Sequence, residues 1–318
     1  MRLRVLPRHF TRVETLKSLI DLLDDKERLR RNLDARDFGS RITDLDEARL
    51  LFSRVIKHTH QVVGLDNLPE TQPDLVLTRR LSRLPQRIMV LYLLFIPVCV
   101  FLLLLSLYLS GGGPGVWLAR GASLSLLVIP LLLYRCTRIN IEHQCGYVRN
   151  WKGEAAIVMD QLQAIQFQSY LAHEYAHHLY VEQFGAQEEE WNREGWSRLV
   201  QWEVAQHLYR QEGNPAYLHH VLIQIVGELK FACQILAKTL HCRLPRQVRR
   251  ISSIYHPNPV HWLLTGTPGF NAMRLLDHAV GTATYFLAAE DLGPKEALRS
   301  RPGSETVTEQ MSSMGTKQ

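Results

Sequence analysis

The chain has 318 residues and a formal net charge of +6, which is enough length for one or two domains with accessory segments. Its basic residues lie beside apolar runs and form no patch interleaved with aromatic residues, a pattern that argues against nucleic-acid binding. The five cysteines contain no CxxC pair and no secreted-type disulfide framework, which favours a reducing compartment.

Residues 1–87 are predicted to form a helical, charged, cytosolic N-terminal segment. Apolar residues recur at helical spacing from Leu16 to Leu23 and again from Leu45 to Ile56, where Thr43 is the expected N-cap. No catalytic constellation appears in this segment, so we expect it to serve in interaction or regulation.

Residues 88–134 are predicted to form a transmembrane helical hairpin. Two apolar runs, 88–109 and 116–134, are each long enough to span a bilayer, and the glycine-rich stretch between them indicates a tight turn. Arg120, near the start of the second run, can extend its charge to the membrane interface. Arginines flank the hairpin on both outer sides, which predicts that both flanks face the cytoplasm. The start of the chain lacks the apolar core of a signal peptide, in agreement with this topology.

The most informative motif is His173-Glu174-x-x-His177. It lies within a stretch of good helix formers from 160 to 184, which Gly185 is expected to end. Two histidines four residues apart lie on one face of a helix, so both imidazoles can reach one metal ion. Glu174 is placed to polarise a metal-bound water rather than to bind the metal.

A third ligand is expected on the next predicted helix, because a catalytic zinc site takes three protein ligands and leaves a fourth position open. Glu194 is the leading candidate, since a carboxylate early on an antiparallel neighbouring helix can face the two histidines. Four other carboxylates are alternatives that more often belong to a solvated charged face. They are Glu188, Glu189, Glu190 and Glu203.

The His-Glu-x-x-His motif, followed by Glu194-Gly195-Trp196-Ser197, resembles the gluzincin metallopeptidases over roughly residues 155–298. The resemblance implies that His173, His177 and Glu194 bind zinc and that Glu174 is the general base.

The segment Asp277–Leu287 is similar to the late helix of that family. Its His278 and Tyr285 are the leading candidates for a group that stabilises the oxyanion of a tetrahedral intermediate. His256 and His261 remain alternatives for this role.

The predicted fold is mainly α, with a zincin-like domain at 135–298, a possible minor sheet from 139–158 and a disordered tail at 299–318. The predicted function is that of a membrane-anchored zinc metallopeptidase with Zn²⁺ as cofactor. Its partners would be a cytosolic or membrane-proximal polypeptide substrate and the lipid bilayer.

Two other functions stay open at this point. The run His173-x-x-x-His177-His178 resembles one histidine box of a membrane di-iron oxygenase, but that class needs several boxes and His219-His220 lacks an earlier partner. The third possibility is a membrane adaptor without turnover. It is kept open by Arg198, because some gluzincins carry an acidic residue four positions after the ligand glutamate.

Overall fold

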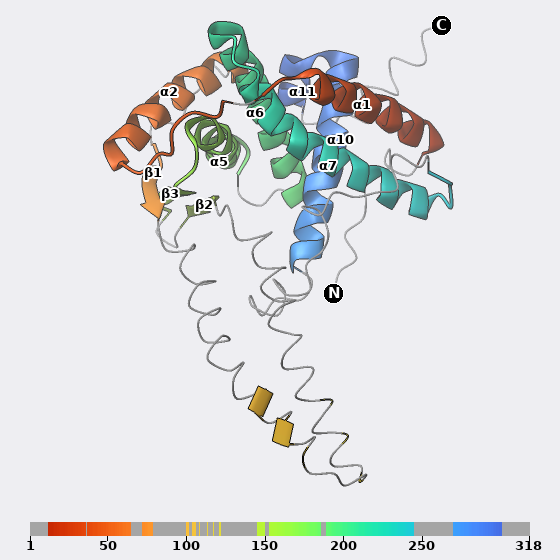
Figure 1. Cartoon of the computed structure of the whole chain (residues 1–318). Coiled ribbons are helices and arrows are strands. Elements are labelled where there is room, and N and C mark those ends of the chain that lie inside the picture. The colour runs from red at the N-terminus through yellow and green to blue at the C-terminus, as the bar shows by residue number, and fades with distance from the viewer. Residues whose placement is uncertain are drawn as a thin grey trace, which may run out of the picture. The chain divides into compact units, whose positions relative to one another are not determined.

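The computed structural model describes residues 12–35, 37–64, 72–78, 145–149, 153–185, 189–244 and 270–300, with isolated residues between 100 and 121. These residues form mainly helices with a small three-stranded sheet, which confirms the predicted mainly α class (Figure 1). The chain divides into two compact units. The first contains Met1–Leu77, Cys145–Pro257 and Ala272–Gln318, and it holds every described residue of the candidate site.

The sheet has the strand order β1-β3-β2, with β1 at Asp74–Thr78, β2 at Gly146–Arg149 and β3 at Ala155–Asp160. Strands β2 and β3 are antiparallel, which gives the minor sheet expected near residues 139–158. Strand β1, however, lies in the segment predicted to be helical. Its leucines pack against the core while Val76 is exposed, and this period of two is that of a strand.

Helices α1 (Val13–Asn32) and α2 (Leu45–Val63) pack into the same core as the helices of the site. The described part of residues 1–87 therefore belongs to the unit that carries the site. The predicted N-cap of α2 was wrong by one residue. Asp44, not Thr43, caps the helix, because its carboxylate accepts hydrogen bonds from the amides of Asp46 and Glu47 at 3.0 Å.

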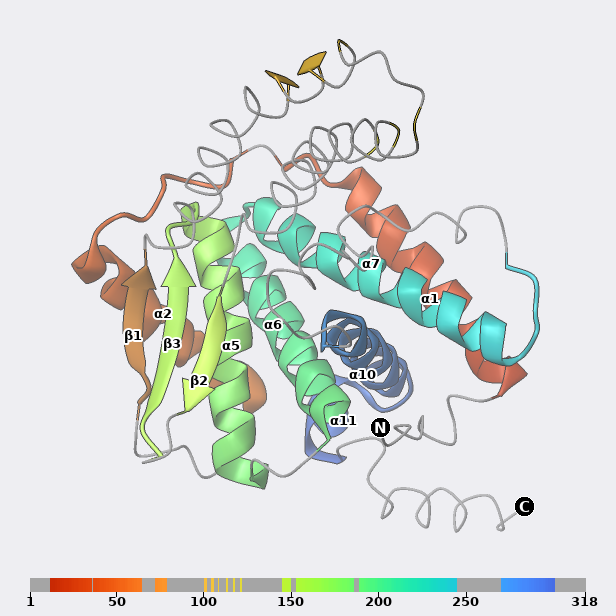
Figure 2. The ribbon, with the colours of Figure 1, turned by 90° about the horizontal axis from the view of Figure 1, so that it is seen from below.

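Helices α5 (Ala164–Phe184) and α6 (Glu190–Glu212) form the centre of the unit. Figure 2 shows the sheet along one side of α5, α6 on its other side and α10 (Phe270–Leu292) beyond α6. Helix α5 begins later than expected because β3 extends to Asp160, and it ends at Gly185 as predicted. Protein surrounds most of α5, so its central polar side chains from Gln168 to His178 face other elements, whereas Glu182 and Gln183 near its end are exposed.

Helix α7 (Ala216–Thr239) packs against α1 and α6. Within the described residues it alone is long and apolar enough to cross a membrane by length and composition, and 67% of its most apolar window is buried in the protein. The predicted spans 88–109 and 116–134 lie almost entirely outside the described residues. Those that are described, such as Phe101 and Leu104, are helical and exposed. The hairpin therefore stays a prediction.

The chain continues from α10 into α11 (Pro294–Ser300), so the first residues of the predicted tail are helical. The rest of that tail lies outside the described residues.

Candidate metal centre

The side chains of two histidines on α5 lie close together. His173 and His177 are separated by one helical turn and therefore lie on the same face. Their Nε2 atoms are 3.1 Å apart, and both side chains are buried. The structure thus brings together the two histidines of the motif as expected.

Helix α6 brings Glu194 to this pair. Its Oε2 atom is 3.4 Å from Nε2 of His173 and 3.4 Å from Nε2 of His177. Ligand atoms bound to a tetrahedral zinc ion at about 2.0–2.2 Å lie roughly 3.3–3.6 Å from one another. The three atoms therefore form a triangle of about the size that one zinc ion requires.

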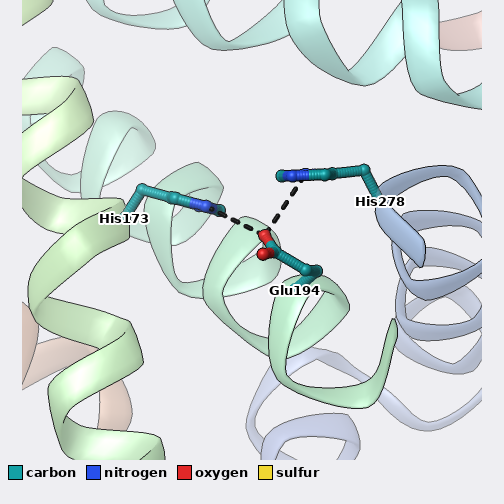
Figure 3. A group of neighbouring side chains, drawn as sticks. All are labelled: His173, Glu194 and His278. Carbon is teal, nitrogen blue, oxygen red and sulfur yellow. Dashed lines mark ion pairs between the residues drawn. The ribbon is translucent and has the colours of Figure 1, made fainter. Parts of the chain in front are cut away.

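His278 approaches the same carboxylate from α10 (Figure 3). Its Nδ1 atom is 3.2 Å from Oε2 of Glu194, so His173, Glu194 and His278 form a cluster that can hold a metal ion. The His278 ring centroid is 6.2 Å from that of His173, compared with 4.6 Å between His173 and His177. Its side chain is 23% exposed, whereas that of Glu194 is 3% exposed. His278 therefore lies on the more accessible side of the cluster.

Helices α6 and α10 touch backbone to backbone beside this cluster. A Cβ atom added to Gly195 would lie 2.3 Å from the carbonyl oxygen of Gly281, and one added to Gly281 would lie 2.0 Å from that of Trp191. Only glycine fits at both positions. Because Gly195 follows Glu194 and Gly281 lies close to His278 along α10, this contact allows the two side chains to meet.

The Glu194 Oε2 atom is buried without a well-aligned hydrogen bond in the described part of the chain, although three imidazole nitrogens surround it. Burial by itself raises the pKa of the Glu194 carboxyl, but the nearby His278 and His177 hold this pKa well below its ordinary value. Burial also lowers the pKa of His173, and the charge of Arg198 adds to this. Metal ions bind ionised carboxylates and neutral imidazoles, so this donor set fits a divalent cation.

Glu174, the predicted general base, lies beside His173 on α5 and is buried. Its Oε2 atom accepts a hydrogen bond of 2.7 Å from the backbone amide of Tyr147 on β2. The Tyr147 hydroxyl in turn lies 3.5 Å from Nδ1 of His178, the third histidine of α5. Strand β2 therefore fixes one oxygen of Glu174, and His178 contacts this strand.

Tyr285 lies elsewhere in the packing between α6 and α10. It is fully buried, its hydroxyl donates a hydrogen bond of 2.5 Å to Asn192, and its ring lies against Gly195. These contacts account for a packing role, and its role as an oxyanion stabiliser stays a prediction. The two alternative histidines, His256 and His261, lie outside the described residues.

Three of the four alternative carboxylates have other partners. Glu189 accepts from the Trp191 indole, Glu190 pairs with Arg193 at 3.6 Å, and Glu203 accepts from a neighbouring glutamine at 2.8 Å. Glu188 lies outside the described residues. Glu194 is the acid that the fold places against the histidine pair.

Ser197 supports the triangle, and sequence reasoning did not assign it a role. Its hydroxyl lies 3.1 Å from Nδ1 of His177, so it can orient the ring whose Nε2 faces Glu194. The corresponding Nδ1 atom of His173 is buried without a hydrogen-bond partner among the described residues. The sequence did contain a signal for this role, because Ser197 follows Glu194 by three residues and therefore shares its helix face.

Arg198 and Glu228 form a second contact near the site that sequence reasoning did not find. The Arg198 guanidinium pairs with both oxygens of Glu228 on α7, at 3.0 and 2.6 Å. In the sequence, Arg198 stands out only as a departure from the gluzincin pattern. No local pattern connects two residues this far apart on different helices.

This chain matches no known family model, no curated protein and no solved structure.

Proposed function

We propose that this chain is a membrane-anchored zinc metallopeptidase that hydrolyses peptide bonds. The observation that carries the proposal is the triangle formed by Nε2 of His173, Nε2 of His177 and Oε2 of Glu194, whose edges of 3.1–3.4 Å are close to those of a tetrahedral zinc site. The neighbouring position of Glu174 in the same motif supports hydrolysis over a purely structural site.

His173, His177 and Glu194 would hold a zinc ion, which would act as a Lewis acid and lower the pKa of a water molecule toward neutrality. Glu174 accepts the proton of the attacking water at its carboxylate and returns it to the leaving amine. The Tyr147 amide holds the Glu174 carboxylate during both transfers. His278, on the accessible side of the cluster, donates to the oxygen of the substrate carbonyl as charge develops there.

The proposed substrate is a polypeptide in the cytosol or close to the membrane surface. Support for the membrane anchor comes from residues 88–134, where the described large apolar side chains are exposed. Phe101 is 63% exposed and Leu104 is 59% exposed, which suits contact with lipid. The arginines on both sides of this stretch favour a cytoplasmic position for the N-terminal segment and the site.

Metal content and hydrolysis of the purified full-length chain test this proposal. We expect one zinc ion per chain, loss of zinc in His173→Ala and Glu194→Ala, and retention of zinc in Glu174→Gln. Glu174→Gln should nevertheless lose hydrolysis of an unfolded polypeptide such as casein. Glu182→Gln is the matched control, because Glu182 lies on the same helix and pairs with Arg149 at 3.1 Å.

Three results would contradict the proposal. Two iron ions per chain would indicate the oxygenase, and absence of metal would indicate the adaptor. A Glu174→Gln variant that keeps both its zinc and the parental hydrolysis rate would remove Glu174 from the mechanism.

A further inference from the structure

Helix α2 carries a buried histidine, His58, that the proposed mechanism does not use. It lies where α2 packs against α6, and its ring centroid is 5.0 Å from that of His207 on α6. The Nδ1 atom of His58 is buried and has no hydrogen-bond partner among the described residues. The surroundings of His58 therefore decide whether its imidazole can carry a proton in this contact.

The charged and titratable groups that act on the His58 ring are all basic. They are His207 from α6, and Arg54 and Lys57 from α2 itself. Helix α6 also brings the acid Glu212, but this carboxylate pairs with Arg54. Helix α2 contacts α5 and α11 as well, and their charged groups are not among those that act on His58. Burial and the basic neighbours lower the pKa of His58, against a hydrogen bond with Gln61 that raises it.

Helix α2 also holds the motif helix α5. The Nε2 atom of His60 is 2.7 Å from the Tyr175 hydroxyl, and the Phe52 ring lies edge-on to the Tyr175 ring at 5.9 Å. Tyr175 lies between the two histidines of the candidate metal centre along α5. Burial lowers the pKa of His60 too, so α2 docks through two imidazoles that favour the neutral form. A change at His58 can therefore reach the helix of the metal centre through α2.

We propose that α2 is a pH-sensitive latch: protonation of His58 beside His207 releases α2 from α6 and loosens its contact with Tyr175 on α5. A protonated imidazole among basic groups and away from water is costly, and release of α2 returns it to water. Because the pKa of His58 is lowered in the docked state, its contribution to docking is present above the ordinary histidine pKa of about 6.5 and is lost as the pH falls below it. This role of His58 does not depend on the proposed peptidase activity.

Hydrogen exchange of the full-length chain, corrected for the intrinsic effect of pH on amide exchange, measures this release. A single histidine that is protonated only in the released state shifts the opening equilibrium by about 10-fold between about pH 7.5 and pH 5.5. We expect the amides of α2, Leu45–Val63, to lose at least about this much protection, because His60 adds to the effect. The amides of α7, Ala216–Thr239, should lose less.

The informative variant is His58→Gln, which removes the titrating ring and keeps a polar side chain. It should reduce the pH response of α2 by up to about 10-fold. His219→Gln is the matched control. Burial lowers the pKa of His219 as well, but this histidine lies on α7 beside Phe38, so its replacement should leave the pH response of α2 unchanged.

Equal pH responses of α2 in the parent and in His58→Gln would overturn the proposal. A parent chain in which α2 loses no more protection than α7 would overturn it without any substitution, even if the variant failed to fold. A response that is lost equally in His58→Gln and His219→Gln would reflect general acid destabilisation and would remove His58 as the latch.

Discussion

Glu194 and Glu228 are carboxylates on neighbouring helices, with side chains that are 3% and 2% exposed, yet their surroundings differ in kind. Glu228 is paired with a guanidinium and accepts a hydrogen bond from Thr282. Glu194 faces imidazole nitrogens, and its Oε2 atom lacks a well-aligned hydrogen bond among the described residues.

Glu228 belongs to a fixed ion pair, whereas the positive group beside Glu194 can be replaced by another cation. Arginine stays protonated at any relevant pH, so Arg198 compensates Glu228 permanently. Imidazoles can carry either a proton or a metal ion, so the charge beside Glu194 can be replaced by a divalent cation.

The largest effect on stability is expected when Glu194 and Glu228 are each replaced by glutamine. Zinc at 1,000 times its dissociation constant should stabilise the parent by about 4 kcal/mol. Glu194→Gln should abolish this zinc-dependent rise in melting temperature because it removes a ligand. Glu228→Gln should instead lower stability by about 3–5 kcal/mol with or without zinc, because it leaves Arg198 buried and unpaired.

Thermal melting of both variants across a zinc titration measures this contrast, with a chelator-treated sample of each as its reference. If Glu194→Gln keeps the zinc-dependent shift, or if zinc ceases to stabilise Glu228→Gln, the two acids do not have separate roles.

Gly281→Ala should have the next largest effect. Its added methyl group would meet the Trp191 carbonyl oxygen at 2.0 Å and force α10 away from α6. We expect a loss of about 2–3 kcal/mol in stability, as for other overpacked sites. Zinc affinity, measured by chelator competition, should change less than stability, because His278 on α10 lies outside the proposed ligand triangle. A loss of zinc binding as complete as that of His173→Ala would make His278 a ligand.

Ser197→Ala should have the smallest effect. It removes the hydroxyl 3.1 Å from Nδ1 of His177, and loss of such an outer contact weakens metal binding by about 10-fold. Ser169→Ala is the matched control, since this buried serine of α5 contacts His220 at 3.0 Å instead. Chelator competition should show weaker zinc binding in the first variant alone. Equal affinities in the two variants would mean that Ser197 does not orient His177.

The parts of this molecule that sequence reasoning recovered are local patterns. The spacing of His173 and His177 is fixed by one helical turn, and the glycine at 185 ends α5 as expected. The mainly helical class follows from similar short-range periodicity. Strand β1 was missed because a short apolar run does not distinguish a strand from a helix.

The sequence by itself determined that the imidazoles of His173 and His177 face the same way, because helical geometry places residues four positions apart on one face. Only the tertiary structure decided which distant groups join them. Glu228 reaches His278 and Arg198 across three helices, and the contact between Gly195 and Gly281 sets how closely α6 and α10 approach. Such contacts depend on how whole helices pack, and no periodicity along the chain encodes them.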